Sequence, residues 1–407
     1  MNCRHCDAAL TQQVIDLGHQ PASNAYLTAA QLEATEGYAP LKVYVCHQCW
    51  LVQIPSFHAS HELFTADYAY FSSVSQSWLD HAQAYVATVT ERFGLNGDDW
   101  VVEVASNDGY LLQYVAQRGI ACTGIEPTAS TAAAARAKGI ESIERFFGTE
   151  LAEELVASRG HASLTAANNV LAHVPDINDF VAGFAVLLAP DGVATFEFPH
   201  LVNLIDGCQF DTIYHEHYSY LSLTTVATIF AAQGLRVFDV EAVPTHGGSL
   251  RVYACRADAG HQTLPAVQAM LDLELAKGVT NPAWYAGLAA EAERIKLDLL
   301  DFLITARRAG KRVGAYGAAA KGNTLLNYAG VRADLVDFVC DAAPSKQGRF
   351  LPGSHVPILP PSALAERKPD YVLILPWNLT AEITKAQAQV HDWGGKFVVA
   401  VPQLTIL

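Results

Sequence analysis

The sequence predicts an α/β fold in three parts: a small cysteine-containing N-terminal lobe, a central doubly wound domain and a second Rossmann-like α/β domain. Two Cys-x2-Cys pairs near the N-terminus mark the lobe. Apolar strand patterns then alternate with helical patterns, which is typical of a parallel sheet. A second strand–turn–helix pattern opens near residue 312 and predicts the last domain. We expect the three parts to span residues 1–76, 77–280 and 281–407.

Composition narrows the class of protein and its partners. The 407 residues suffice for two or three domains, and with 51% hydrophobic and 16% charged residues the chain is not disordered. The formal charge of −15 argues against a nucleic-acid or membrane partner but allows an anionic small molecule. No apolar run approaches the roughly 20 residues of a membrane span. The N-terminus has no signal-peptide pattern and eight cysteines are too few for a disulfide scaffold. We therefore expect a cytoplasmic protein, and we expect it to be a monomer.

The N-terminal lobe carries two matched cysteine pairs, Cys3-x2-Cys6 and Cys46-x2-Cys49. Each pair suits a tight turn that presents two thiolates to one metal, and four thiolates complete a tetrahedral zinc site with no open position. Four free thiols or two local pairs are the alternative. His47 lies inside the second pair and is not expected to be a ligand. We predict a structural zinc ion that stabilises a lobe without a large core.

Aromatic and hydroxyl side chains are dense at residues 55–80. Such side chains suit binding of a sugar or a base, and ordinary packing between lobes is an equally good explanation. They are Phe64, Tyr68, Tyr70, Phe71, Ser72, Ser73, Ser75 and Trp78. A helical pattern over 77–93 follows.

A buried strand at 100–104 runs into a polar turn and then an apolar helix, which is how a doubly wound sheet begins. The turn is not the G-x-G-x-x-G fingerprint, because Ala105 holds the first glycine position and only Gly109 remains. A second strand ends in Glu126, where an acid can bind both hydroxyls of an adenosine ribose; a solvated strand end is the alternative. We expect the following residues to bind the cofactor: Glu103, Ala105, Asn107, Gly109, Glu126 and Asn168.

Strands and helices continue to alternate through the central domain. Strands are expected at 140–143, 162–167, 193–198, 235–242 and 249–255. Helices are expected at 128–138, 149–157, 177–188 and 222–234, with a polar helical region at 262–310. Pro190-Asp191-Gly192 predicts a turn, and His246-Gly247-Gly248-Ser249 separates the last two strands. His173 follows the fourth strand at the edge where ligands lie in such sheets, so it is a site candidate; a capping or core histidine is the alternative.

The segment Tyr214-His215-Glu216-His217-Tyr218 concentrates titratable side chains. If it is extended, alternation places Tyr214, Glu216 and Tyr218 on one face and the two histidines on the other. Proton transfer is favoured because histidine titrates near neutrality, and a polar patch joining two domains is the alternative. A metal held by this segment is disfavoured, because neighbours on a strand rarely converge on one ion.

The C-terminal domain opens with a strand at 312–316 and a turn of small residues. Lys321-Gly322-Asn323 then begins a helix. Small residues let backbone N–H groups approach a phosphate at a helix N-terminus, and Lys321 adds a positive charge. We predict diphosphate binding by Lys321 and Asn323, with simple tight packing as the alternative. Further strands are expected at 335–340, 370–375 and 397–401.

These patterns favour a methyltransferase. S-adenosylmethionine requires an acid for its ribose and a polar strand-end loop, and the central domain offers both; the C-terminal domain would hold a nucleotide-linked substrate. A zinc hydrolase needs an open metal position, which four cysteines close. The alternative function is a nucleotide-sugar oxidoreductase that uses NAD in the C-terminal domain.

Over essentially its whole length the chain resembles the S-adenosylmethionine-dependent sugar C-methyltransferases of antibiotic and surface-sugar pathways, and most of all the 3-C-methyltransferases of dTDP-linked 4-keto-deoxysugars. The motifs that carry the resemblance are C-x2-C…C-x2-C, E-V-A-S-N-D-G-Y-L-L, G-I-E-P, N-N-V-L-A-H-V-P-D, Y-H-E-H and G-A-A-A-K-G-N. Ala105 departs from the pattern, because many methyltransferases carry glycine there.

The resemblance implies transfer of a methyl group to C3 of the sugar through an enolate. His217 looks like the base and Tyr214 like the phenol that polarises the ketone, although spacing does not decide between them. Glu216 would orient a histidine and His173 would lie in the same pocket. Tyr68 matches a residue that reaches the sugar, and we place Ser72 with it in the substrate site.

Overall fold

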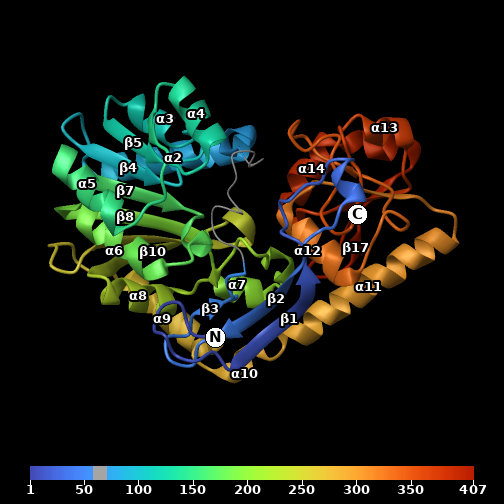
Figure 1. Cartoon of the computed structure of the whole chain (residues 1–407), viewed down its shortest axis with the longest axis horizontal. Coiled ribbons are helices and arrows are strands. Elements are labelled where there is room, and N and C mark those ends of the chain that lie inside the picture. Colours follow the sequence, from blue (N-terminus) through green and yellow to red (C-terminus); the bar gives the residue numbers. More distant parts are fainter. Residues whose placement is uncertain (58–70) are drawn as a thin grey trace.

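The computed structural model describes residues 1–57 and 71–407, and a seven-stranded sheet forms the centre of this described part (Figure 1). Its strand order is β10-β11-β8-β7-β4-β5-β6. The strands are β4 (Trp100–Val104), β5 (Ala121–Ile125), β6 (Glu141–Ile143), β7 (Ala162–Asn168), β8 (Leu188–Pro199), β10 (Leu235–Val243) and β11 (Ser249–Arg256). The helices around it are α2 (Gln76–Phe93), α3 (Leu112–Ala116), α4 (Ala129–Ala137), α5 (Thr149–Arg159), α6 (Ile177–Leu187), α7 (Leu201–Asp206), α8 (Leu223–Ala232) and α9 (Pro265–Lys277). The predicted doubly wound domain is confirmed.

The sheet departs from an all-parallel arrangement at one edge. Strands β6, β5, β4, β7 and β8 pair in parallel, whereas β11 pairs antiparallel with both β8 and β10. Only a short loop joins β10 to β11, and a short loop allows an antiparallel pair but not a parallel one. The tip of this loop lies next to the end of β8, since Ser249 of β11 pairs with Pro199 of β8.

The turn predicted at Pro190-Asp191-Gly192 is absorbed into β8. The register jumps here: Ala162 pairs with Leu188, and Leu164 already pairs with Val193. A Cβ atom on Gly192 would lie 2.9 Å from the Ala162 oxygen, so the backbones approach too closely for a side chain. The turn residues therefore form a bulge inside one long strand.

The N-terminal lobe contains the described sheet β1-β2-β3-β9, formed by β1 (Gln12–Gln20), β2 (Ala39–Val45), β3 (Val52–Gln53) and β9 (Ser219–Tyr220). Strand β9 comes from the central part of the sequence, directly after the Tyr214–Tyr218 segment. Val52 pairs with Tyr220 and Gln53 with Ser219. The lobe therefore holds the end of that segment by a strand ladder.

The C-terminal domain has a mixed sheet of order β14-β13-β12-β15-β16-β17 among the described residues. Its strands are β12 (Val313–Tyr316), β13 (Val339–Cys340), β14 (Ile358–Leu359), β15 (Tyr371–Ile374), β16 (Lys396–Val399) and β17 (Thr405–Ile406). Its helices are α12 (Ala320–Ala329), α13 (Ala363–Arg367) and α14 (Thr380–Ala386), and α10 (Pro282–Tyr285) and α11 (Leu288–Arg308) precede them. The predicted α/β domain is confirmed, although the predicted strand 335–340 is shortened to two residues.

Helix α11 ties the C-terminal domain to the lobe, and it runs along both in Figure 1. Its buried residues recur at helical spacing and form one apolar stripe: Leu288, Ala292, Ile295, Leu299, Leu303 and Ala306. They share one hydrophobic core with Val43 of the lobe and Val313 of the C-terminal domain. The four cysteines lie at the other end of the lobe, and Cys3, Cys46 and Cys49 pack into the core of the central domain. The lobe thus contacts both α/β domains.

Candidate active site

The turn after β4 has the backbone conformation of a cofactor-binding loop. Ala105, Asn107 and Gly109 all have positive φ angles, of 58°, 49° and 74°. A non-glycine residue in this region is strained by roughly 1 to 2 kcal/mol, which explains why glycine suits the position that Ala105 holds. The amide of Ala105 donates to the Ile125 oxygen at 2.8 Å, so the turn is anchored to the next strand.

Glu126 holds this turn from the end of β5. One of its oxygens accepts from the Asn107 amide at 3.0 Å and the other from the Thr128 amide at 2.8 Å. Burial raises the pKa of this carboxyl, and the backbone hydrogen bonds oppose that rise. Each carboxylate oxygen has a second lone pair, so Glu126 retains acceptor capacity for ribose hydroxyls.

Three other predicted residues lie around the same turn. Glu103 is fully buried and burial raises its pKa well above the usual range, with a hydrogen bond from Tyr110 acting against the rise. Asn168 ends the neighbouring strand β7. The amide of Ser72, in the 3₁₀ turn η2 (Ser72–Val74), donates to the Asn107 side chain at 2.9 Å. Ser72 therefore lies beside the cofactor turn. Tyr68 lies outside the described residues.

The Tyr214–Tyr218 segment is a turn rather than the extended strand considered above. The amide of His217 donates to the Tyr214 oxygen at 2.9 Å. This folds Tyr214 and His217 together, whereas an extended chain would place them on opposite faces. The Tyr214 hydroxyl lies 2.7 Å from His217 Nε2, and the two ring centroids are 3.9 Å apart. The two residues proposed for the chemistry therefore form a dyad.

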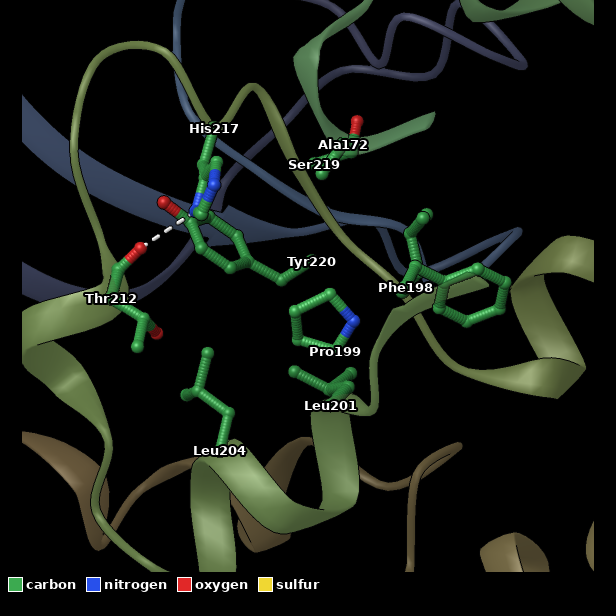
Figure 2. Close-up of a pocket in the computed structure, with 10 residues that line it drawn as sticks. Ala172, Phe198, Pro199, Leu201, Leu204, Thr212, His217, Ser219 and Tyr220 are labelled. Atoms are coloured by element: carbon green, nitrogen blue, oxygen red, sulfur yellow. Dashed lines mark hydrogen bonds between the residues drawn. The ribbon is translucent and has the colours of Figure 1, made fainter. Parts of the chain in front are cut away.

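The hydrogen bonds of His217 fix its tautomer. Its Nδ1 lies 2.8 Å from the backbone oxygen of Thr212 in η4 (Phe210–Thr212), so Nδ1 carries the proton (Figure 2). In the neutral ring Nε2 then carries a lone pair, which accepts a hydrogen bond from the Tyr214 hydroxyl. Burial, and next the nearby His173, lower the pKa of His217 well below the usual range. The imidazole is therefore neutral and available as a base.

His173 lies against this dyad, as predicted from its place after β7. It ends the 3₁₀ turn η3 (Leu171–His173), and its ring centroid is 4.6 Å from that of His217 in an edge-on contact. Burial lowers its pKa to about 4, while a hydrogen bond with the Glu216 backbone raises it. Two neutral imidazoles thus stack edge to face at the carboxyl edge of the sheet.

A small apolar cavity of about 20 Å³ adjoins His217. Figure 2 shows its lining around the ring, with Tyr220 next to His217 and Pro199, Leu201 and Leu204 opposite. This volume is near that needed for one water molecule, and it is far too small for a substrate. The apolar wall accounts for the strong desolvation of the base.

The remaining residues of the segment contact the N-terminal lobe. Glu216 is 2% exposed, and one of its oxygens accepts from the Asn24 side chain at 2.7 Å. His215 Nε2 lies 3.3 Å from the Pro40 oxygen. That the Glu216 carboxylate orients a histidine stays a prediction, and this contact gives it a role in joining lobe and turn.

The C-terminal domain contacts the chain just before this turn through Trp377 and Thr324, and Lys321 packs on Trp377. The Lys321 ammonium donates to the Asn378 side chain at 2.7 Å and lies 4.5 Å from the ring centroid of Trp377. Burial lowers the pKa of Lys321 and the charge of Asp211 opposes this. The Trp377 indole donates to Asp211 at 2.8 Å, and Thr324 donates to the Ile213 oxygen at 2.9 Å. These bonds attach η4, and with it the catalytic turn, to the C-terminal domain.

That Asn323 binds a diphosphate stays a prediction, although its position in the structure has another explanation. Its side chain is fully buried and donates to the Ser23 oxygen of the lobe at 2.6 Å. The small residues of the preceding turn are explained by packing, because a Cβ atom on Gly317 would lie 2.4 Å from Pro376 and one on Gly322 would lie 2.7 Å from Leu375. The Ala318 amide already donates to a carboxylate, that of Asp341. Lys321 also stays a candidate for binding the substrate.

The four cysteines of the lobe converge as a metal site requires. Their sulfur atoms all lie within 4.8 Å of one another, and Cys3–Cys49 and Cys6–Cys46 are each 3.5 Å apart. Zinc–sulfur bonds of about 2.3 Å place tetrahedral ligands about 3.8 Å apart, so the arrangement fits one zinc ion. Gln53 donates to the Cys3 sulfur at 3.1 Å and orients that ligand.

Sequence reasoning missed several residues of the junction between the central and C-terminal domains. Asp211, Trp377 and Thr324 carried no motif, and their roles depend on contacts between distant segments. His246 belongs to the turn His246-Gly247-Gly248-Ser249, and the two glycines in this turn indicate a tightly constrained loop.

Comparisons with known proteins identify the domains of the chain. Models of three domains match in order: a zinc binding domain at 3–64, a methyltransferase domain at 78–240 and a C-methyltransferase C-terminal domain at 244–402. The C-methyltransferase NovU of Streptomyces niveus is 36% identical over 405 residues, covering 100% of this chain and 96% of NovU.

Solved methyltransferases resemble part of the chain. The 1,6-didemethyltoxoflavin N1-methyltransferase of Burkholderia thailandensis covers 51% of this chain and 95% of its own at 16% identity and a TM-score of 0.36. The magnesium protoporphyrin IX methyltransferase of Synechocystis covers 44% and 79% at 15% identity and a TM-score of 0.34. Among the described residues, no helix combines the length and apolar character of a membrane span. On its three domain matches and its full-length relative, the chain belongs to the C-methyltransferase family, with a zinc-binding N-terminal lobe.

Proposed function

We propose that this C-methyltransferase moves the methyl group of S-adenosylmethionine to C3 of a dTDP-linked 4-keto-deoxysugar. The observation that carries the proposal is the Tyr214–His217 dyad, which lies between the predicted cofactor turn and the C-terminal domain. Methylation of carbon requires a carbanion equivalent, and a ketone provides one when a base removes the neighbouring proton. A neutral imidazole beside a phenol supplies a base and a donor for the enolate oxygen.

The dyad assigns the proton-transfer roles. The Thr212 carbonyl holds the proton on Nδ1, so Nε2 of His217 is the basic atom. In the free enzyme the Tyr214 hydroxyl donates to this atom. A substrate ketone that accepts the Tyr214 hydrogen bond instead would free the Nε2 lone pair. Substrate binding would thus polarise the ketone and expose the base through one rotation of a hydroxyl.

The reaction then has two steps. His217 Nε2 removes the C3 proton, and the electron pair forms an enolate whose oxygen is stabilised by Tyr214 and by the charge of Lys321. When bound, S-adenosylmethionine would supply the methyl group that the C3 carbon takes, with the sulfur–methyl bond breaking and S-adenosylhomocysteine as the leaving group. His217 loses its proton to solvent. The positive sulfonium is discharged, and one proton is released for each methyl transferred.

We place S-adenosylmethionine at the turn 105–109, with Glu126 on its ribose and Glu103 and Asn168 beside it. The nucleotide part of the substrate would lie against the C-terminal domain near Lys321, with Tyr68 and Ser72 reaching the sugar. We retain the domain boundaries 1–76, 77–280 and 281–407 and a monomeric state as parts of the proposal.

Mass spectrometry across a panel of dTDP- and GDP-linked 4-keto-deoxysugars tests the proposal. We expect a gain of one methyl group on a dTDP-linked 4-keto sugar, and loss of deuterium from a substrate labelled at C3. Methylation of an acceptor without a ketone, or retention of the C3 deuterium in the product, would overturn it. The family assignment sets aside the NAD-dependent oxidoreductase, and a thermal-shift panel of S-adenosylhomocysteine and NAD checks this directly.

A further inference from the structure

His246 is a half-buried histidine at the domain junction, and the proposed reaction does not use it. It lies in the 3₁₀ turn η5 (Thr245–Gly247), in the loop between β10 and β11. This loop is anchored at the end of β8, because Thr245 donates to Glu197 at 2.8 Å and the His200 amide donates to the Gly248 oxygen at 3.0 Å. The loop therefore stands at the same edge of the sheet as the catalytic dyad.

The backbone of this loop is strained at His246. Its φ of 55° and ψ of 24° are left-handed, a conformation that is strained for most residues other than glycine and asparagine. Gly247 and Gly248 follow with φ of 90° and 107°. A histidine persists at a position suited to glycine, so the fold holds its side chain in one direction at a cost in stability.

The loop packs between helix α7 and the C-terminal domain. A Cβ atom on Gly247 would lie 2.6 Å from the Trp377 ring of the C-terminal domain, and one on Gly248 would lie 2.3 Å from the Asn203 side chain of α7. Neither position has room for a side chain. Among residues 246–248, His246 alone presents a functional group at the junction.

The surroundings of His246 are those of a binding site. Its ring meets Trp78 edge-on at 5.1 Å between centroids, and Trp78 in turn stacks on Tyr110 at 5.8 Å. Burial and the charge of Lys321 lower the pKa of His246 to about 4, and His246 in turn lowers the pKa of His217. The imidazole is therefore neutral and lies within electrostatic reach of both Lys321 and the base.

One atom of the ring has no partner. Nδ1 of His246 is buried and makes no hydrogen bond to any residue that the structure describes. A buried polar atom without a partner is unfavourable, so a bound ligand that supplies the partner gains binding energy. A neutral imidazole has one donor and one acceptor, and a hydroxyl group complements either.

We propose that His246 is a further substrate-binding residue, which hydrogen-bonds a hydroxyl group of the methyl acceptor where the acceptor passes between Trp78 and Trp377. The proposal rests on the proposed function in that it takes the acceptor to be a hydroxylated nucleotide sugar. The acceptor is favoured over the cofactor because the loop contacts Trp377 and is influenced by Lys321, both of the C-terminal domain.

The test compares His246→Gly with the parent enzyme and with a control, His261→Ala. Glycine relieves the left-handed strain, so we expect the Tm of His246→Gly to stay near that of the parent. Titration of a dTDP-linked 4-keto-deoxyhexose into the S-adenosylhomocysteine complex should show at least a tenfold loss of affinity. Affinity for S-adenosylhomocysteine itself should not change. His261 stacks on Phe238 at 4.7 Å, and its variant should keep both affinities.

The outcomes separate the two proposals. Unchanged sugar affinity in His246→Gly overturns the role of His246, whether or not the parent methylates the sugar. Lost affinity for S-adenosylhomocysteine with normal sugar affinity overturns it too, by placing His246 on the cofactor. A parent that binds the sugar but transfers no methyl group refutes the proposed function while the affinities still decide His246. A parent that neither binds nor methylates any sugar of the panel refutes both.

Discussion

Replacing His217 by asparagine tests the chemistry most directly, because the replacement keeps much of the local structure. The amide nitrogen of asparagine can take the place of Nδ1 and donate to the Thr212 oxygen, as His217 does at 2.8 Å. The hydrogen bond from Tyr214 is lost, at a net cost of about 1 kcal/mol. We therefore expect a folded variant with a slightly lowered Tm.

The effect on turnover should be far larger than the effect on stability. A positioned general base contributes about 10²–10⁴-fold, which corresponds to about 2.7–5.5 kcal/mol in the barrier. We expect kcat for methyl transfer to fall by this factor while the affinity for S-adenosylhomocysteine stays the same. Exchange of the C3 proton for deuterium in the presence of S-adenosylhomocysteine isolates the first step, and it should fall in parallel with kcat.

Tyr214→Phe is the matched comparison, because it removes the other member of the dyad and leaves Nε2 in place. Loss of one donor to a developing oxyanion costs about 10²–10³-fold. Exchange should therefore slow by no more than this factor in Tyr214→Phe and by at least as much in His217→Asn. If His217→Asn exchanges at the parental rate while Tyr214→Phe does not exchange at all, Tyr214 is the base and the tautomer argument fails.

Four further outcomes follow from the structure. Glu126→Ala should weaken binding of S-adenosylhomocysteine at least tenfold in calorimetry, since the two oxygens of this carboxylate also hold the backbone amides of Asn107 and Thr128. An unchanged affinity would refute the cofactor assignment. Lys321→Ala should raise KM for the nucleotide sugar and leave cofactor affinity alone, and the reverse pattern would place the substrate elsewhere. Gly317→Ala should destabilise the protein by more than Gly330→Ala in urea unfolding. Both glycines have positive φ, but only at Gly317 would the added Cβ atom lie 2.4 Å from another side chain, that of Pro376. Equal losses of stability would contradict the packing explanation. Elemental analysis should find one zinc per chain, and Cys46→Ser should lower that content and the Tm together; a metal-free protein of parental Tm would refute the structural zinc.

Local patterns predicted the parts of the fold that depend on local physics. The spacing within each cysteine pair predicted a turn that presents two thiolates to one metal, and the structure brings the two pairs together. The structure contains the expected strand β4, the turn with Gly109 and the acid Glu126. A buried apolar strand and a polar turn can be recognised from a few residues of sequence. The order of strands and helices followed for the same reason.

The conformation of the Tyr214–Tyr218 turn could not be predicted from a short stretch of sequence. Alternation over five residues suggested a strand, and the actual turn is held by groups far away in the sequence. Thr324 bonds the Ile213 oxygen and Trp377 bonds Asp211, while Asn24 bonds Glu216. The sequence did not show the contact of Asn323 with the Ser23 oxygen for a related reason: a polar side chain at a helix start suits a phosphate, but it suits a neighbouring backbone carbonyl just as well. Such choices between partners depend on tertiary contacts.

The position of this turn explains why a three-part protein is needed for a reaction that one α/β domain could otherwise host. The proposed cofactor turn belongs wholly to the central domain, but the position of the proposed base, His217, depends on the other parts too. Its tautomer depends on Thr212, whose neighbours Asp211 and Ile213 are held by the C-terminal domain, and the segment ends in β9, which completes the sheet of the zinc lobe. The dyad thus has its geometry only when both flanking parts are docked. Because the proposed sugar nucleotide would bind against the C-terminal domain, docking and assembly of the base are coupled, and this coupling favours proton removal only when the acceptor is in place.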